Sequence, residues 1–117
     1  MDFEPSARTR ELQDRLAAFI DERVDPAEPV HREQVRASGD PHFHPPVMEE
    51  LKAEARDRGL WNLFLPASGP DTDLGAGLST LEYAPLCELM GASPLSQEAT
   101  NCSAPDTGNM ELLAKFA

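Results

Sequence analysis

The first apolar pattern of the chain predicts an amphipathic helix over residues 6–26. Its apolar stripe repeats at helical spacing and comprises Leu12, Leu16, Phe19, Ile20 and Val24. Ser6 is a suitable N-cap for this helix. We expect the helix to end at Asp25-Pro26, because proline disfavours helical geometry at the residue before it. The opposite face is charged, so the helix is expected to pack from one side.

A second helix is predicted over residues 45–59, after a connector. The connector, residues 26–46, holds several prolines and a Gly39-Asp40 turn signal, so it favours at most a short helical piece around residues 30–36. Pro45-Pro46 opens the second helix and Gly59 is placed to end it. Its buried stripe is predicted to be Val47, Met48, Leu51 and Ala55.

The apolar run at residues 60–66 has no pairing partner elsewhere in the chain, so it predicts an extended buried connection instead of a strand. A loop rich in glycine and aspartate follows. Ser79 and Glu82 then form a capping-box signature for a third helix that ends at Gly91. Pro85 is expected to kink this helix or delay its regular start. Its apolar residues are Leu81, Leu86, Leu89 and Met90. These patterns predict one all-α domain, a bundle of about four to five helices.

Composition narrows the possible partners. The 117 residues carry a net charge of −11, with 21 acidic and 10 basic side chains. This balance argues against nucleic acid or an anionic membrane as a partner, because both require a basic surface. No segment has the apolar length of a membrane span, and the N-terminus lacks a signal-peptide pattern. We therefore expect a cytoplasmic protein whose Cys87 and Cys102 are free, small and mostly buried.

Two motifs suggest chemistry, and each has a simpler interpretation. His42 and His44, with His31 upstream, resemble a zinc-binding spacing, but three or four converging ligands are needed and none is evident. An exposed proline-rich loop is favoured there, and no metal is predicted. The glycines at residues 75–77 precede a helix, where a tight turn is favoured over a phosphate cradle. The residues alone identify no catalytic group. They describe an acidic helical module that packs on a partner or on other parts of its own chain.

The closing stretch "ATNCSAPDTGNMELLAKFA", residues 99–117, reads as a helix interrupted by Pro105 and Gly108. Together with the motifs before it, this stretch resembles the N-terminal helical domain of acyl-CoA dehydrogenases. The matching positions are Gly59-Leu60, Leu63, Pro66, Gly75, Gly77-Leu78-Ser79, Glu88 and Gly91, in that order. The likeness covers residues 6–117 and is nearest to the branch that in animals is fused to a kinase-like phosphotransferase domain. The chain departs from the pattern at Pro66-Ala67, where many members have Pro-Glu.

The resemblance implies an FAD enzyme of fatty acid metabolism that converts an acyl-CoA to a trans-2-enoyl-CoA and passes electrons to an electron-transfer acceptor. In that family the catalytic base lies in a C-terminal helical domain, and FAD contacts come mostly from that domain, a middle β-domain and a neighbouring subunit. Residues 1–117 would then be an N-terminal domain that stops before its last helix. We expect this chain alone to be inactive and to bind no FAD.

The resemblance also implies substrate-binding residues, because the closing helix runs beside the acyl chain in family members. By position, Asn101, Ala104, Pro105 and Gly108 would face the acyl tunnel, with Cys102 and Thr107 as neighbours. The alternative is that the small residues only permit close helix packing. The polar residues of this stretch, Asn101, Ser103, Asp106 and Asn109, would suit a substituted acyl chain.

Two other functions remain open. The chain could be a free-standing helical interaction module, or one chain of a split dehydrogenase. If other domains normally cover it, apolar surface should be exposed on the closing helix and on residues 60–65, and such surface favours a homo-oligomer.

Overall fold

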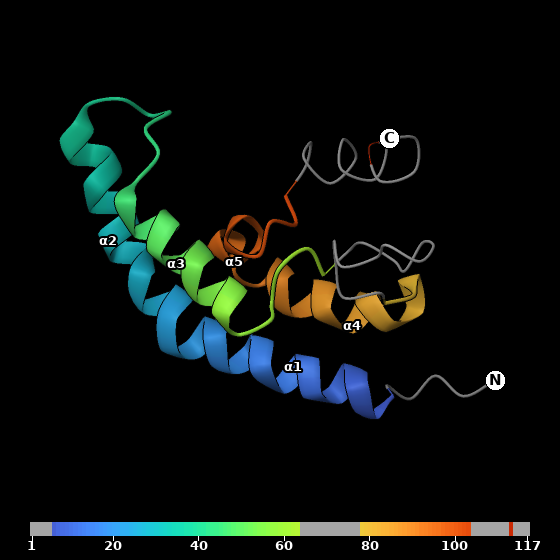
Figure 1. The fold of residues 1–117 in the computed structure, drawn as a ribbon. Helices are drawn as coiled ribbons and strands as arrows, with labels where there is room; N and C mark the ends of the chain where they lie inside the picture. Colours follow the sequence, from blue (N-terminus) through green and yellow to red (C-terminus); the bar gives the residue numbers. More distant parts are fainter. Residues whose placement is uncertain (1–5, 64–77, 104–112, 114–117) are drawn as a thin grey trace.

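The computed structural model describes residues 6–63, 78–103 and 113. Every regular element within these ranges is helical and none is a strand, which confirms the all-α prediction (Figure 1). The elements in chain order are α1 (Ala7–Phe19), the π-helical turn η1 (Ile20–Val24), α2 (Asp25–Ser38), α3 (Pro46–Asp57), α4 (Thr80–Gly91) and α5 (Pro94–Ala99).

Helix α1 begins where the sequence predicted. The Ser6 hydroxyl accepts a hydrogen bond of 3.2 Å from the backbone N–H of Thr9 and so caps the first turn. The predicted apolar stripe is buried in full, with Leu16, Phe19 and Val24 at 0% exposure. This stripe supplies much of the core.

The predicted helix end at Asp25-Pro26 is wrong. The chain stays helical through η1 and α2 as far as Ser38, so the predicted connector is mostly helix. In η1 the N–H of Asp25 bonds to the carbonyl of Ile20, five residues back, and this wider turn gives the ring of Pro26 room. Burial of Val24 and Ala27 continues the apolar stripe across the turn and outweighs the proline's lost hydrogen bond.

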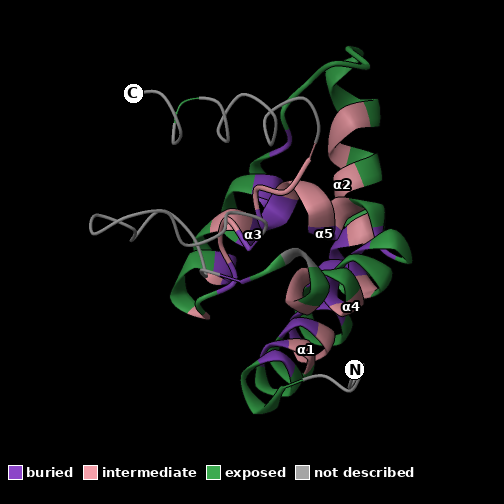
Figure 2. Ribbon diagram, turned by 90° about the vertical axis from the view of Figure 1, so that its right-hand side faces the viewer, coloured by how far each residue is buried: buried purple, intermediate pink, exposed green. Residues whose placement is uncertain are grey.

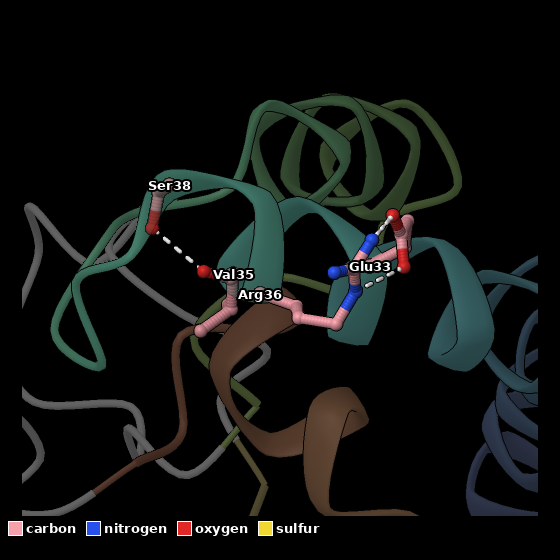
Figure 3. A network of polar contacts seen from close by, with 4 residues as sticks. All are labelled: Glu33, Val35, Arg36 and Ser38. Atoms are coloured by element: carbon pink, nitrogen blue, oxygen red, sulfur yellow. Dashed lines mark hydrogen bonds and ion pairs between the residues drawn. The ribbon is translucent and has the colours of Figure 1, made fainter.

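Helix α2 ends at Gly39, whose φ of 71° is a left-handed conformation that glycine adopts without strain. Figure 3 shows the last turn, where the Ser38 hydroxyl donates a 2.7 Å hydrogen bond to the Val35 carbonyl. Arg36 binds Glu33 through both Nε and Nη2 on the same exposed surface. An exposed pair of this kind adds little stability, so the glycine and the serine define the helix end.

Helix α3 has the predicted start, stripe and end. Pro46 occupies its first turn, and the Gln34 side chain of α2 accepts a 3.0 Å hydrogen bond from the free N–H of Val47. At the other end, the N–H of Leu60 bonds to the Ala55 carbonyl over 2.8 Å, and Gly59 has a φ of 75°. This is a Schellman ending, which turns the chain back under the helix.

Helix α4 carries the predicted capping box. The Ser79 hydroxyl accepts from the Glu82 N–H, and the Glu82 carboxylate accepts from the Ser79 N–H, each over 3.1 Å. Glu82 also accepts a 3.4 Å bond from the Ser6 hydroxyl, so the starts of α1 and α4 are joined. The cap fixes the first turn at Thr80, upstream of Pro85, and the expected delay of the helix start is therefore wrong.

The helices α3, α4 and α5 pack on one side of the long bent rod formed by α1, η1 and α2 (Figure 1). Figure 2 shows the buried residues gathered between these elements. Leu60 and Leu63 are 0% exposed, so at these two leucines the predicted burial is confirmed and the expectation of exposed apolar surface is wrong. The rest of that prediction, for residues 64–66, lies outside the described residues. Cys87 is exposed, contrary to prediction, because α4 turns Leu86 and Met90 inward in its place. Cys102 is half-buried, and both thiols are free as predicted.

Candidate functional site

The candidate site lies where the segment after α5 meets the loop after α3. The backbone N–H of Asn62 donates a 3.0 Å hydrogen bond to the carbonyl of Thr100. Thr100 is itself fully buried, and its hydroxyl donates a 2.8 Å bond to the Ser96 carbonyl one turn back in α5. Thr100, the residue after α5, is therefore held by hydrogen bonds to the helix before it and to the loop at residues 60–63.

Two asparagines in the left-handed region form the centre of this junction. Asn62 has a φ of 54° and Asn101 a φ of 59°, and they are the non-glycine residues with positive φ among the described parts of the chain. The Asn101 side-chain nitrogen donates a 2.7 Å hydrogen bond to the Asn62 side-chain oxygen, across 39 positions of sequence. Asparagine tolerates this backbone conformation better than most side chains, and such residues gather at functional sites. We call Asn62 and Asn101 the asparagine pair.

Tyr83 of α4 lies beside the same segment. Burial raises the pKa of its phenol well above its usual value, and the neighbouring thiols of Cys102 and Cys87 add to the effect. The phenol therefore stays protonated to a higher pH than the phenol of an exposed tyrosine. Cys102 is held in turn by its backbone N–H, which donates a 2.7 Å bond to the Gln97 carbonyl.

Of the predicted substrate-binding residues, Asn101 lies in this junction, partly buried. Ala104, Pro105 and Gly108 lie outside the described residues, as does the predicted neighbour Thr107. Their proposed contact with an acyl chain stays a prediction.

Sequence reasoning missed Asn62 as a partner of Asn101. An asparagine inside the apolar run "LWNLF" is a turn signal, because asparagine adopts left-handed backbone angles. That signal could have located the turn. It could not have identified the partner, which arrives from a distant part of the chain.

The other motifs do not join this site. Among residues 6–63, 78–103 and 113, no group of three or more metal-binding side chains converges. The N–H of His42 bonds to the Asp40 carboxylate over 2.9 Å, which is a turn contact. His31 instead borders an open hollow of about 380 Å³ between α2 and α5. Its other lining residues are Glu28, Arg32, Val35, Pro41, Pro94 and Leu95. None of the helices among the described residues is long and apolar enough to cross a membrane.

Comparison with known proteins relates the chain to one enzyme family. It is 49% identical over 113 residues to "Acyl-CoA dehydrogenase family member 10" of Mus musculus, and 49% identical over 118 residues to "Probable acyl-CoA dehydrogenase FadE2" of Mycobacterium tuberculosis. These matches cover 95% and 99% of this chain but 10% and 27% of the two relatives. No protein-family model matches.

A solved structure agrees with the sequence matches. The structure of a "putative acyl-CoA dehydrogenase from Mycobacterium abscessus" superposes with a TM-score of 0.82 at 45% identity, covering 97% of this chain and 29% of that one. The all-α arrangement seen here thus matches part of the acyl-CoA dehydrogenase fold. The chain is homologous to acyl-CoA dehydrogenases along nearly its whole length, and the resemblance drawn from its sequence is confirmed. It spans less than a third of the length of these relatives.

Proposed function

We propose that the chain acts as the N-terminal helical domain of an FAD-dependent acyl-CoA dehydrogenase, where it supplies part of the wall of the acyl-binding site. The observation that carries this proposal is the 49% identity to two relatives named as acyl-CoA dehydrogenases, over 95–99% of the chain. In the proposed reaction an α-proton passes to a carboxylate base and the β-hydrogen leaves as hydride, which gives a trans-2-enoyl-CoA. FAD, when bound, would supply the hydride acceptor, and an electron-transfer acceptor would take up the electrons.

The two described glycines with positive φ are poorly placed to bind the pyrophosphate of FAD. Gly39 and Gly59, two glycines able to bring backbone close to a ligand, both follow helix C-termini. Helix C-termini carry negative partial charge, which disfavours a pyrophosphate. We therefore propose that FAD is held by parts of the enzyme outside these residues, together with the catalytic base.

The proposed acyl-binding residues are Asn101 and, beyond the described segment, Ala104, Pro105 and Gly108. Small side chains at such positions leave room for an apolar chain, and larger ones shorten the space. We propose further that the enzyme is a homo-oligomer of the cytoplasm. Leu81 of α4, 58% exposed, is one apolar side chain that could serve such an interface.

A graft tests the proposed function. This chain replaces the matching segment of the Mycobacterium abscessus homologue, and the graft is assayed for acyl-CoA-dependent reduction of an electron-accepting dye. The same enzyme with its own segment reinserted at the same junctions is the control. We expect the graft to bind flavin and to dehydrogenate acyl-CoA. A folded, flavin-bound graft without this activity would contradict the proposal and favour an interaction module unrelated to catalysis.

A substitution in the graft tests the acyl-wall assignment. Ala104→Leu should move the preference toward shorter acyl chains, because it narrows the proposed site. Ala84→Leu, on the exposed side of α4, is the matched control and should leave the preference unchanged. Equal effects of the two substitutions would remove Ala104 from the acyl wall.

A further inference from the structure

We propose that Asn62 is a positioning residue that sets the course of residues 101–103, and through them the start of the acyl-binding wall. The proposal rests on the proposed function for its chemistry. Its geometry rests on the junction itself. Asn62 comes from the loop after α3, far in sequence from the wall that it would position.

The first step of the argument is the backbone. Residues 60–63 are anchored to the core, because Leu60 and Leu63 are fully buried and the Leu60 N–H completes the Schellman ending of α3. Asn62 stands between these two anchors with its N–H bonded to the Thr100 carbonyl. It is thus a rigid part of the core surface and not a freely moving loop residue.

The second step is the turn that the chain makes after α5. Thr100 ends the helix, and Asn101 takes a left-handed conformation that redirects the chain. A left-handed backbone is unfavourable for most side chains, so it persists only where contacts compensate for it. One such contact is the 2.7 Å bond from the Asn101 side-chain amide to the Asn62 side-chain oxygen, beside the 3.0 Å bond from the Asn101 backbone N–H to the Glu98 carbonyl.

The third step is what the pair does for a ligand. Because an Asn101 side-chain N–H is engaged by Asn62, the direction of the Asn101 side chain is set before any ligand arrives. A pre-set direction lowers the ordering penalty on binding. Asn62 therefore acts through Asn101 and the residues after it, without touching the substrate.

The test begins with amide hydrogen exchange in this chain. Asn62→Gly keeps the left-handed backbone but deletes the side-chain acceptor, whereas Asn62→Asp keeps an acceptor oxygen of the same shape. We expect Asn62→Gly to speed exchange at the amides of Asn101 and Cys102 by about five-fold, the worth of one net hydrogen bond. Asn62→Asp should restore protection to within about two-fold of the parent chain.

A double-mutant cycle completes this arm. Asn101→Gly should speed exchange at Cys102 by a similar factor, and the double variant should add little to either single one. Fully multiplicative effects would show that the two side chains act independently and would overturn the proposal. Unchanged exchange in Asn62→Gly would overturn it as well.

The second arm uses the grafted enzyme. Asn62→Gly should raise KM for long saturated acyl-CoAs by about five-fold while kcat changes less, because the pair positions the acyl chain and not the reacting atoms. Asn62→Asp should rescue KM, which a purely structural defect would not predict. If the exchange effect is present but the graft is inactive, the proposed function fails and the positioning of residues 101–103 stands. If the graft is active and Asn62→Gly leaves KM unchanged at every chain length, the positioning role in substrate binding fails.

Discussion

Replacing Leu86 tests the packing of α4 against the core. Leu86 is 0% exposed and belongs to the apolar core cluster that α4 forms with α1 and its neighbours. Full burial of a leucine side chain is worth about 1.5–3 kcal/mol, and the cavity left by truncation adds to this. We expect Leu86→Ala to lower the free energy of unfolding by about 3 kcal/mol.

Leu81 on the same helix provides the matched control. Its side chain is 58% exposed, so less than half of its apolar surface leaves water on folding and no cavity forms when it is truncated. Leu81→Ala should therefore lower the free energy of unfolding by only about 0.5–1 kcal/mol. The two variants remove the same atoms from the same helix, and only their surroundings differ.

Urea denaturation, followed by the helical circular dichroism signal, measures both variants. With a slope of about 2 kcal/mol per molar urea, Leu86→Ala should move the midpoint down by about 1.5 M and Leu81→Ala by less than about 0.5 M. If the dependence of the free energy of unfolding on urea concentration is the same as in the parent chain, the substitutions changed the stability and left the surface exposed on unfolding unchanged. Equal midpoints for the two variants would refute the placement of Leu86 in the core.

Two further predictions concern the end of α3 and the only tyrosine. Gly59→Ala should lower the free energy of unfolding by about 1–2 kcal/mol, because φ is 75° at this position. Gly91→Ala is the control: Gly91 lies in open space at the end of α4, so this change should leave the free energy of unfolding unchanged or raise it by up to about 1 kcal/mol. Equal shifts of the melting temperature in the two variants would contradict this prediction. Tyr83, with a pKa raised by burial and the adjacent thiols, should develop phenolate absorbance only at higher pH than in the urea-unfolded chain. In the unfolded chain the phenol ionises at about pH 10, whereas in the folded chain it stays protonated to higher pH. The contribution of this phenol to the free energy of unfolding should therefore be fully present below that pH and be lost as the pH rises above it. A titration identical in buffer and in urea would rule out the burial effect.

Local signals placed most helix ends correctly. Ser6, the Ser79–Glu82 pair and Gly59 each act within a few residues, through a hydroxyl, a carboxylate or a left-handed backbone that the residue type itself favours. The apolar stripe of α3 was also predicted residue by residue, because helical spacing alone decides which side chains share a face. These are short-range properties, and a sequence carries them explicitly.

The prediction at Asp25-Pro26 failed for the opposite reason. Local proline chemistry favours a helix end there, yet the chain continues through a π-turn because burial of Val24 and Ala27 outweighs one lost backbone bond. The exposure of Cys87 has a similar cause. Cysteine is a residue type that favours burial, but the orientation of α4 gives the inward positions to Leu86 and Met90.

The sequence by itself determined the helical class, the apolar stripes, most caps and the family, since each depends on residue types at fixed spacing along the chain. Tertiary structure alone decided that Asn62 and Asn101, separated by 39 positions, share a hydrogen bond, and that Tyr83 packs beside Cys102. A contact between distant segments depends on how the helices pack, and packing is a property of the summed buried surface and not of any one stretch. The proposed wall of the acyl site begins at this junction, where that packing brings the two asparagines together.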